Sequence, residues 1–214
     1  MGENREFMVF FAILEYLCGS LMFSYWLGLA VKKDLKTVGD GNPGAFNLWH
    51  AAGYKLGLLG VILDFMKGYL PLVALYESGI VKNSQIVPVA LAPILGHIFP
   101  VFTKFKGGKA VAVTFGVWSA ITRFQVSLVF AVILAVFQLG ARLVKKGKRV
   151  SSEADGVMVV AGMLVLGIYL KAAEYAHTFI LIWLFNLILF VLANRGKLYK
   201  YWKEKTEKRI PYGY

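Results

Sequence analysis

Residues 124–141 read FQVSLVFAVILAVFQLGA, eighteen consecutive positions without a charged side chain. The hydrocarbon core of a bilayer is about 30 Å thick, so a helix that crosses it needs about 20 mostly apolar residues. On either side of this stretch, six further segments are also mostly apolar. The sequence therefore predicts an all-α integral membrane protein with seven transmembrane helices, at residues 7–31, 56–77, 84–102, 109–122, 124–141, 156–170 and 176–193.

The composition supports this class of protein. Hydrophobic residues make up 58% of the 214 positions, which is above the usual share in a soluble domain. A net charge of +12 in a soluble protein would suggest a nucleic-acid partner, but here the charges lie in short connections between apolar segments. We therefore expect no nucleic-acid partner. The single cysteine excludes an internal disulfide and a cysteine-based metal cluster.

Lysines and arginines gather in every second connection between the apolar segments. Of the 24, nineteen lie on one side and four on the other, and Lys67 lies inside a span. Short loops that are rich in Lys and Arg face the cytoplasm. The alternation predicts an outside N-terminus, a membrane domain at residues 1–193 and a basic cytoplasmic tail at 194–214. The basic connections are 32–55, 103–109, 142–155 and that tail.

Segment 109–122 is short for a full crossing, and only Arg123 separates it from the next segment. A tilted or partly re-entrant helix is the alternative. We count the segment as a span because the charge alternation would otherwise lose its register in the second half of the chain.

Ionisable side chains inside the spans are candidates for function, because placing a charge in a membrane is costly. Asp64 and Lys67 are three residues apart on one predicted helix, so they share a face and can pair. A purely structural ion pair is an equally good interpretation. His97 lies late in the third span, shortly before a cluster of lysines and glycines. Glu15 is also mid-span, but it has no partner nearby in the sequence and we assign it no chemistry.

The connection at residues 38–47 reads VGDGNPGAFN and has the composition of a phosphate-binding loop. Glycines allow backbone conformations that turn several N–H groups inward, and such a nest binds phosphate oxygens. The amides of Asn42 and Asn47 can donate further hydrogen bonds. An ordinary turn between helices is the alternative for this stretch taken alone.

The connection at residues 102–109 reads FTKFKGGK and is a second candidate anion site. Its lysines supply positive charge, and its glycines permit close backbone approach at the start of the next predicted helix. Charge that only sets the membrane orientation is the alternative, but it leaves the Gly–Gly pair unexplained. The loop is not a Walker A motif, because Thr103 and Ala110 stand where Gly and Ser/Thr are required. Three scattered histidines and no acidic cluster predict no metal site.

Together these motifs resemble the bacterial acyl-phosphate:glycerol-3-phosphate acyltransferases, the PlsY family of integral membrane enzymes. That family transfers a fatty acyl group from acyl phosphate to the 1-hydroxyl of glycerol 3-phosphate, which gives lysophosphatidic acid and phosphate. Its seven spans and outside N-terminus agree with the topology inferred from the charges. The likeness covers about residues 15–115 and is carried, in order, by 19–20 (GS), 41–47 (GNPGAFN), 64–68 (DFMKG), 96–102 (GHIFPVF) and 105–109 (FKGGK).

The resemblance implies roles for the residues of these motifs. His97 would position or deprotonate the attacking hydroxyl, and Lys104 is the second predicted catalytic residue. No cofactor or metal would be needed. The partners would be acyl phosphate, glycerol 3-phosphate and membrane lipids, with the protein a monomer or weak homodimer in the bacterial cytoplasmic (inner) membrane. The predicted substrate-binding residues are Ser20, Gly41, Asn42, Gly44, Asn47, Asp64, Lys67, Lys106, Gly107, Gly108 and Lys109.

Several positions depart from the family pattern. Asp40 stands where the family usually has serine, and a carboxylate there should repel phosphate unless a neighbour such as Lys36 or His50 neutralises it. On this view Asp40→Ser should lower the Michaelis constant for glycerol 3-phosphate. Near the C-terminus, Lys197 and Lys200 align with a family asparagine and arginine. The departures keep two alternatives open: an acyl-phosphate-dependent transferase with a different alcohol acceptor, and a catalytically silent lipid-binding paralogue.

Overall fold

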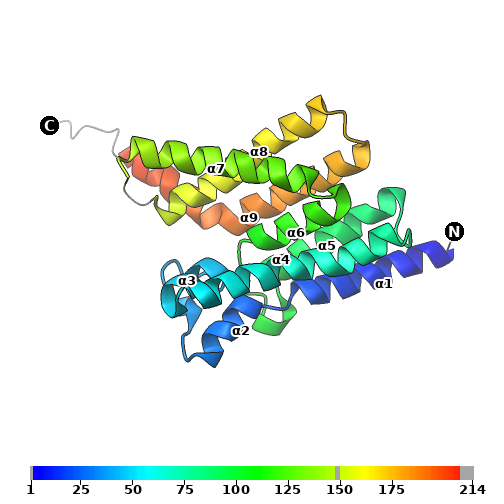
Figure 1. Cartoon of the computed structure of the whole chain (residues 1–214), viewed down its shortest axis with the longest axis horizontal. Helices are drawn as coiled ribbons and strands as arrows, with labels where there is room; N and C mark the ends of the chain where they lie inside the picture. Colours follow the sequence, from blue (N-terminus) through cyan, green and yellow to red (C-terminus); the bar gives the residue numbers. More distant parts are fainter. Residues whose placement is uncertain (1, 148–149, 208–214) are drawn as a thin grey trace.

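The computed structural model describes residues 2–147 and 150–207, and this part of the chain is helical apart from its connections (Figure 1). Four of the nineteen basic residues behind the charge alternation, Lys148, Arg149, Lys208 and Arg209, lie outside the described residues, as does the end of the predicted tail. The α-helices of the described residues are α1 (Gly2–Gly19), α2 (Phe23–Ala30), α3 (Ala45–Ala52), α4 (Tyr54–Glu77), α5 (Ile86–Ile98), α6 (Val111–Thr122), α7 (Gln125–Val144), α8 (Ser152–Ala172) and α9 (His177–Glu207).

Six segments of the described chain, rather than seven, are long and apolar enough to cross a membrane. The predicted span at residues 109–122 instead forms α6, a helix of 12 residues. At about 1.5 Å per residue, α6 is roughly 18 Å long, which is shorter than a hydrocarbon core of about 30 Å. The multi-pass membrane character is confirmed, whereas the seventh crossing stays a prediction. The six segments are Glu6–Ala30, Tyr54–Glu77, Asn83–Thr103, Gln125–Val144, Ser152–Ala172 and His177–Glu207.

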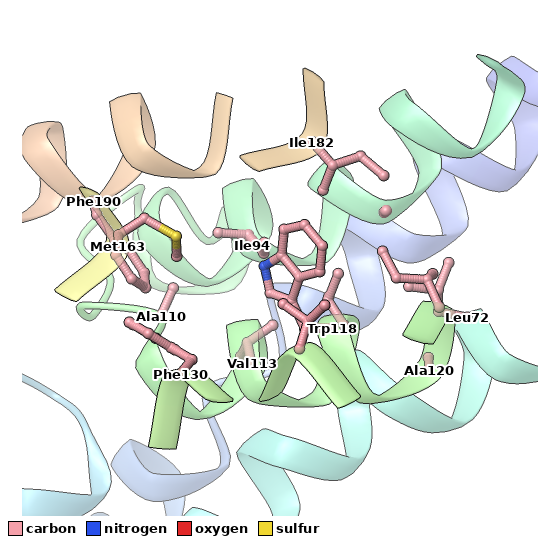
Figure 2. Close-up of a cluster of buried hydrophobic side chains, with 14 of the residues drawn as sticks. Leu72, Ile94, Ala110, Val113, Trp118, Ala120, Phe130, Met163, Ile182 and Phe190 are labelled. Carbon is pink, nitrogen blue, oxygen red and sulfur yellow. The ribbon is translucent and has the colours of Figure 1, made fainter. Parts of the chain in front are cut away.

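Helix α6 lies inside the bundle, where other helices surround it. Nine of its 12 residues are buried, and Val113 and Trp118 belong to the apolar cluster shown in Figure 2. Glycine allows its close packing on α4, since a Cβ on Gly68 would lie 2.6 Å from the carbonyl oxygen of Val113. The indole N–H of Trp118 donates to Oδ1 of Asn186 on α9 at 3.1 Å. These contacts fix α6, and the loop that precedes it, between α4 and α9.

The first apolar segment, predicted as one helix at residues 7–31, is divided into α1 and α2 by a turn at residues 20–22. The backbone of this turn has a partner, because the carbonyl oxygen of Leu21 accepts a hydrogen bond from Nζ of Lys67 at 2.5 Å. Non-helical backbone at membrane depth is tolerated where the protein satisfies its polar groups. The buried lysine on α4 and the break in the first span therefore stabilise each other.

The basic connections gather at one end of the bundle. In Figure 1, α2, α3, the start of α8 and the end of α9 lie toward one end of the long axis, and the N-terminus lies at the other. Helix α9 runs without interruption from His177 to Glu207, so the predicted boundary between residues 193 and 194 falls inside a helix. Residues 194–207 therefore continue α9 at the basic end, and the division of the chain at residue 193 stays a prediction.

Candidate active site

A cavity of about 780 Å³ lies at the basic end of the bundle. Four separate segments line it: the loop before α3 together with α3 itself, the Lys–Gly loop before α6, the start of α8 and the second half of α9. Because segments so far apart in the sequence meet here, we name this cavity the polar pocket. Its lining includes Asp40, Asn42, Asn47, His50, Lys109, Ser152, Lys197 and Lys200.

A second cavity of about 320 Å³ adjoins the polar pocket. The two share the walls formed by the loop before α3 and by Lys109. We name the second cavity the apolar slot, because most of its remaining lining is hydrophobic. Asp64 and His97 also line it, so ionisable groups are present beside the shared wall. The hydrophobic lining residues are Ala45, Phe46, Val61, Ala110, Val111, Ala112 and Phe115.

Asn47, near the start of α3, holds the glycine-rich loop in shape. Its Nδ2 group donates to the carbonyl oxygens of Val38 and Asn42 at 2.7 and 2.9 Å, and to Oδ1 of Asp40 at 2.9 Å. Gly39, with a φ of +56°, comes so close that a Cβ on it would lie 2.8 Å from Oδ1 of Asn47. The amide donors of Asn47 are thus used inside the loop, not offered to a ligand as the sequence suggested.

Asn42 forms the next turn of the same loop. Its Oδ1 accepts from the N–H of Gly44 at 3.0 Å, and its own N–H donates to Oδ1 of Asp40 at 3.2 Å. Gly41 has a φ of +72°, the left-handed conformation that a nest of inward N–H groups requires. Within the described chain, this arrangement leaves the Nδ2 group of Asn42 as a donor for a ligand at the shared wall.

Asp40 is paired with two lysines from distant parts of the chain. Its Oδ2 accepts a hydrogen bond from Nζ of Lys197 on α9, lies 3.2 Å from Nζ of Lys109, and accepts from Oγ of Ser152 at 2.8 Å. Burial by itself would raise the pKa of Asp40, but the hydrogen bond from Lys197, the charge of Lys109 and the hydrogen bond from Ser152 hold that pKa well below its usual range. Asp40 therefore carries a negative charge, which the positive charges of the two lysines compensate.

A chain of buried polar groups links α2, α4 and α5 beside the apolar slot. Oδ2 of Asp64 accepts a hydrogen bond from Oγ of Ser24 at 2.8 Å. Oδ1 of Asp64 pairs with Nζ of Lys67, also at 2.8 Å. Nδ1 of His97 lies 3.9 Å from the same Oδ1 of Asp64, so the carboxylate stands behind the imidazole. Such contacts are often long in ligand-free sites and shorten when substrate binds. The predicted Asp64–Lys67 pair is confirmed, and it is placed to orient His97.

The two glycines of the Lys–Gly loop let it fold against the end of α5. The N–H of Gly108 donates to the carbonyl oxygen of His97 at 3.0 Å. A Cβ on Gly107 would strike the carbonyl oxygens of His97 and Ile98, and a Cβ on Gly108 would strike Nε2 of His97. The same Cβ would lie 3.3 Å from Oδ1 of Asn42. The close approach is thus to His97, and it brings Nε2 of His97 close to the glycine-rich loop before α3.

Five predicted site residues line neither cavity: Ser20, Lys67, Lys104, Lys106 and Gly108. Ser20 is buried beside α5, and its Oγ donates to the carbonyl oxygen of Tyr16 at 2.8 Å. The side chains of Lys104 and Lys106 are exposed and line neither cavity. Lys104 follows the short 3-10 helix Val101–Thr103 and has a φ of +55°, in the left-handed region. Of the three lysines in this described loop, Lys109 is the one that lines the cavities.

Some residues of the site were not recognised from the sequence. Ser24 gave no signal, because it occupies one more position in an apolar span. Lys197 was noted only as a departure from the family's C-terminal pattern, and Ser152 was not singled out, yet both interact with Asp40. Lys36 and His50, which the sequence offered as examples of a neutralising neighbour, form no ion pair with Asp40 in the described structure; Lys109 and Lys197 take that part. Closeness in the sequence therefore did not identify the partners of Asp40, one of which comes from the distant helix α9.

Known proteins match this chain over most of its length. A family model described as glycerol-3-phosphate acyltransferase matches residues 9–203. Glycerol-3-phosphate acyltransferase 1 of Thermotoga maritima is 35% identical over 198 residues, which cover 91% of this chain and 97% of the relative. The glycerol-3-phosphate acyltransferase of Aquifex aeolicus is 39% identical over 129 residues, 60% of this chain and 67% of the relative.

Two solved structures agree with the fold as well. The crystal structure of PlsY, an integral membrane glycerol 3-phosphate acyltransferase, in its glycerol 3-phosphate form gives a TM-score of 0.77 at 29% identity and covers 96% of both chains. The lysophosphatidic acid form gives a TM-score of 0.77 at 27% identity over 92% of both chains. The likeness extends through α7, α8 and α9, beyond the motifs that first suggested it. The chain belongs to the glycerol-3-phosphate acyltransferase family.

Proposed function

We propose that this protein is a membrane acyltransferase of phospholipid synthesis, which moves a fatty acyl group from acyl phosphate to the 1-hydroxyl of glycerol 3-phosphate. Lysophosphatidic acid and phosphate are the products. The observation that carries the proposal is the junction of a lysine-lined polar pocket with an apolar slot beside His97. Family membership supports the acceptor, and the sequence motifs support acyl phosphate as the donor.

The polar pocket suits the phosphate of glycerol 3-phosphate. Three lysines, Lys109, Lys197 and Lys200, line this cavity, against two carboxylates, those of Asp40 and Glu153. Lys109 and Lys197 pair directly with Asp40. Hydrogen bonds from ammonium groups to phosphate are stronger than neutral ones. Asp40 therefore leaves the site net positive and does not exclude a phosphate dianion. The alternative of a less anionic acceptor was motivated by Asp40, and its pairing with two lysines removes that motive.

The apolar slot suits the acyl chain of the donor. Val61, Val111 and Phe115 contribute hydrocarbon walls, and burial of alkyl groups against such walls is favourable because it removes them from water. The donor's phosphate would then lie at the shared wall, near Lys109 and Nδ2 of Asn42. This placement puts the acyl carbonyl carbon between the two cavities, where the hydroxyl of the acceptor arrives.

At the junction, the hydroxyl oxygen of glycerol 3-phosphate attacks the acyl carbonyl carbon. An ester C–O bond forms, the bond from that carbon to the phosphate oxygen breaks, and the pair of electrons leaves with phosphate. Nε2 of His97 takes the hydroxyl proton and returns it to the departing phosphate, while Asp64 stabilises the imidazolium through Nδ1. Acyl phosphate is a mixed anhydride with a good leaving group, so positioning and charge stabilisation supply most of the catalysis.

Purified protein is expected to release phosphate from palmitoyl phosphate when glycerol 3-phosphate is present, with an equal amount of lysophosphatidic acid. We expect no turnover with palmitoyl-CoA, because the chain lacks the His-x-x-x-x-Asp pattern of thioester-using glycerophosphate acyltransferases. Lys55, Phe102 and Ile182 stand five residues after the three histidines. Phosphate assays and mass spectrometry of the lipid product give the readout. Turnover with palmitoyl-CoA but none with palmitoyl phosphate would contradict the donor, and an inert protein would support the silent paralogue.

For the topology, we propose that all seven apolar segments cross the bacterial cytoplasmic membrane, with the N-terminus outside and the polar pocket facing the cytoplasm. Support for the seventh crossing comes from the position of α6, since a helix surrounded by protein need not match the bilayer thickness by itself. Support for the orientation comes from the basic connections that surround the polar pocket.

Cysteine labelling in intact cells tests this topology. In a Cys18→Ala background, we expect Ser84→Cys, at the end opposite to the pocket, to react with an impermeant maleimide. Lys106→Cys, at the pocket end, should react after the cells are opened and not before. Both positions are exposed in the structure, so a difference in labelling reports the side of the membrane. Ready labelling of Lys106→Cys in intact cells would contradict the proposed orientation and place the polar pocket outside.

A further inference from the structure

The two carboxylate oxygens of Asp40 contact two different parts of the protein. Oδ1 accepts hydrogen bonds from the N–H of Asn42 and from Nδ2 of Asn47, so it belongs to the glycine-rich loop. Oδ2 faces the opposite way, toward Lys109 before α6 and Lys197 on α9. One side chain thus connects the loop to two of the three lysines that line the polar pocket.

The surroundings of Asp40 make this connection strong. The side chains of Asp40 and Lys197 each keep 17% of their exposure, and that of Lys109 keeps 20%. Solvent screening is therefore weak, and two ammonium groups that share this space repel each other unless a carboxylate lies between them. Nζ of Lys197 also donates to Oγ of Ser152, which fixes its position relative to α8.

We propose that Asp40 is a positioning residue for phosphate recognition: it acts through Lys109 and Lys197, whose ammonium groups it holds in the polar pocket. This claim rests on the proposed function. Asp40 and Lys197 are both departures from the pattern of the family that the sequence resembles, and they are in direct contact. The contact indicates that the two departures form one unit, in which a charged pair takes the place of two neutral side chains.

Loss of the Asp40 carboxylate should therefore weaken the binding of glycerol 3-phosphate, whereas the sequence alone predicted tighter binding. The charge of Asp40 is already compensated, so its removal changes mainly the positions of the lysines. In Asp40→Asn, a carboxamide oxygen can still accept the loop hydrogen bonds, but the amide hydrogens replace the acceptor that faces the lysines. We expect the dissociation constant for glycerol 3-phosphate to rise about tenfold, as for the loss of one charge-assisted hydrogen bond. We expect kcat to change less than about threefold, since neither His97 nor Asp64 is touched.

A double-mutant cycle tests whether Asp40 and Lys197 act as a unit. The variants are Asp40→Ser, Lys197→Asn and the double variant. The measurement is equilibrium binding of radiolabelled glycerol 3-phosphate to detergent-solubilised protein. The Michaelis constant for glycerol 3-phosphate is measured in parallel. Each single variant should weaken binding about tenfold. The double variant, which restores a neutral pair, should bind within about threefold of the unmodified protein, because serine and asparagine can hydrogen-bond to each other.

The matched control is Asp34→Asn, which makes the same change in the same connection. Oδ1 of Asp34 accepts a hydrogen bond from the backbone N–H of Lys36 at 3.0 Å and so caps the short 3-10 helix Leu35–Thr37. Asparagine caps a helix N-terminus about as well as aspartate. We expect Asp34→Asn to leave binding and turnover unchanged.

The outcomes separate this inference from the proposed function. Unmodified protein that binds glycerol 3-phosphate without acyl transfer would contradict the proposed function, and the binding cycle would still decide the role of Asp40. Tighter binding in Asp40→Ser, or effects in the cycle that simply add, would overturn the positioning role. A lower thermal midpoint with unchanged binding would show that Asp40 is merely structural and would also overturn it. If the unmodified protein does not bind glycerol 3-phosphate, both proposals are wrong.

Discussion

His97→Ala is expected to lower kcat about 10²- to 10⁴-fold, the usual contribution of a general base. The physical reason is that Nε2 of His97 lies near the glycine-rich loop, while Oδ1 of Asp64 lies 3.9 Å from Nδ1, where it would orient the ring. The Michaelis constant for glycerol 3-phosphate should change little, because in the proposed mode of binding the lysines of the polar pocket hold the phosphate. Initial rates of phosphate release at varied glycerol 3-phosphate give both constants.

The control for this variant is His177→Ala. His177 begins α9 at the end far from the polar pocket and is exposed, so its loss should leave turnover unchanged. A His97→Ala protein that keeps full kcat but needs much more glycerol 3-phosphate would show that His97 binds phosphate and does not accept the hydroxyl proton. The thermal midpoint of each variant should be measured too, because His97 is buried against Gly108.

Lys109→Ala is expected to lower kcat/KM about ten- to hundredfold. A hydrogen bond from an ammonium group to phosphate contributes about 1.5–3 kcal/mol, and each 1.4 kcal/mol is a factor of about ten. Lys109 is placed for this role because it lines both cavities and lies 3.2 Å from Oδ2 of Asp40. The loss should appear with either substrate held at saturation, since the shared wall serves the phosphates of both.

Lys104→Ala is the matched comparison for Lys109→Ala, because it removes the same charge from the same loop. The sequence assigned Lys104 a catalytic role, but its side chain is exposed and lies outside both cavities. We therefore expect a change of less than about threefold, which is typical of a solvated surface charge. Equal losses in the two variants would mean that the loop acts through its total charge and not through the position of Lys109.

The sequence was sufficient for those features that depend on local pattern. Apolar length predicted the membrane helices, and the spacing of Asp64 and Lys67 predicted their pair, because residues three apart on a helix share a face. Motif order placed His97 beside the Lys–Gly loop, and the structure confirms this contact through Gly108. In each case the relevant partners lie close together in the sequence or on adjacent motifs.

Other features depend on contacts that no local pattern encodes. The break between α1 and α2 is explained by Lys67, 46 residues away from the carbonyl group of Leu21 that it contacts. Lys197 meets Asp40 across 157 positions, and although the family pattern marked both residues as departures, nothing in the sequence indicated that they are in contact. The length of α6 depends on the helices around it, so hydropathy alone could not decide whether residues 109–122 cross the bilayer. Tertiary packing decides each of these features.

The central claim is that the polar pocket holds glycerol 3-phosphate with its hydroxyl beside His97. A structure of the unmodified protein with bound glycerol 3-phosphate tests it most directly. We predict phosphate density in contact with Lys109 and Lys197, and the 1-hydroxyl oxygen within about 3.2 Å of Nε2 of His97, the reach of a general base. Phosphate bound instead at the exposed Lys104 and Lys106, with the hydroxyl far from His97, would contradict the account.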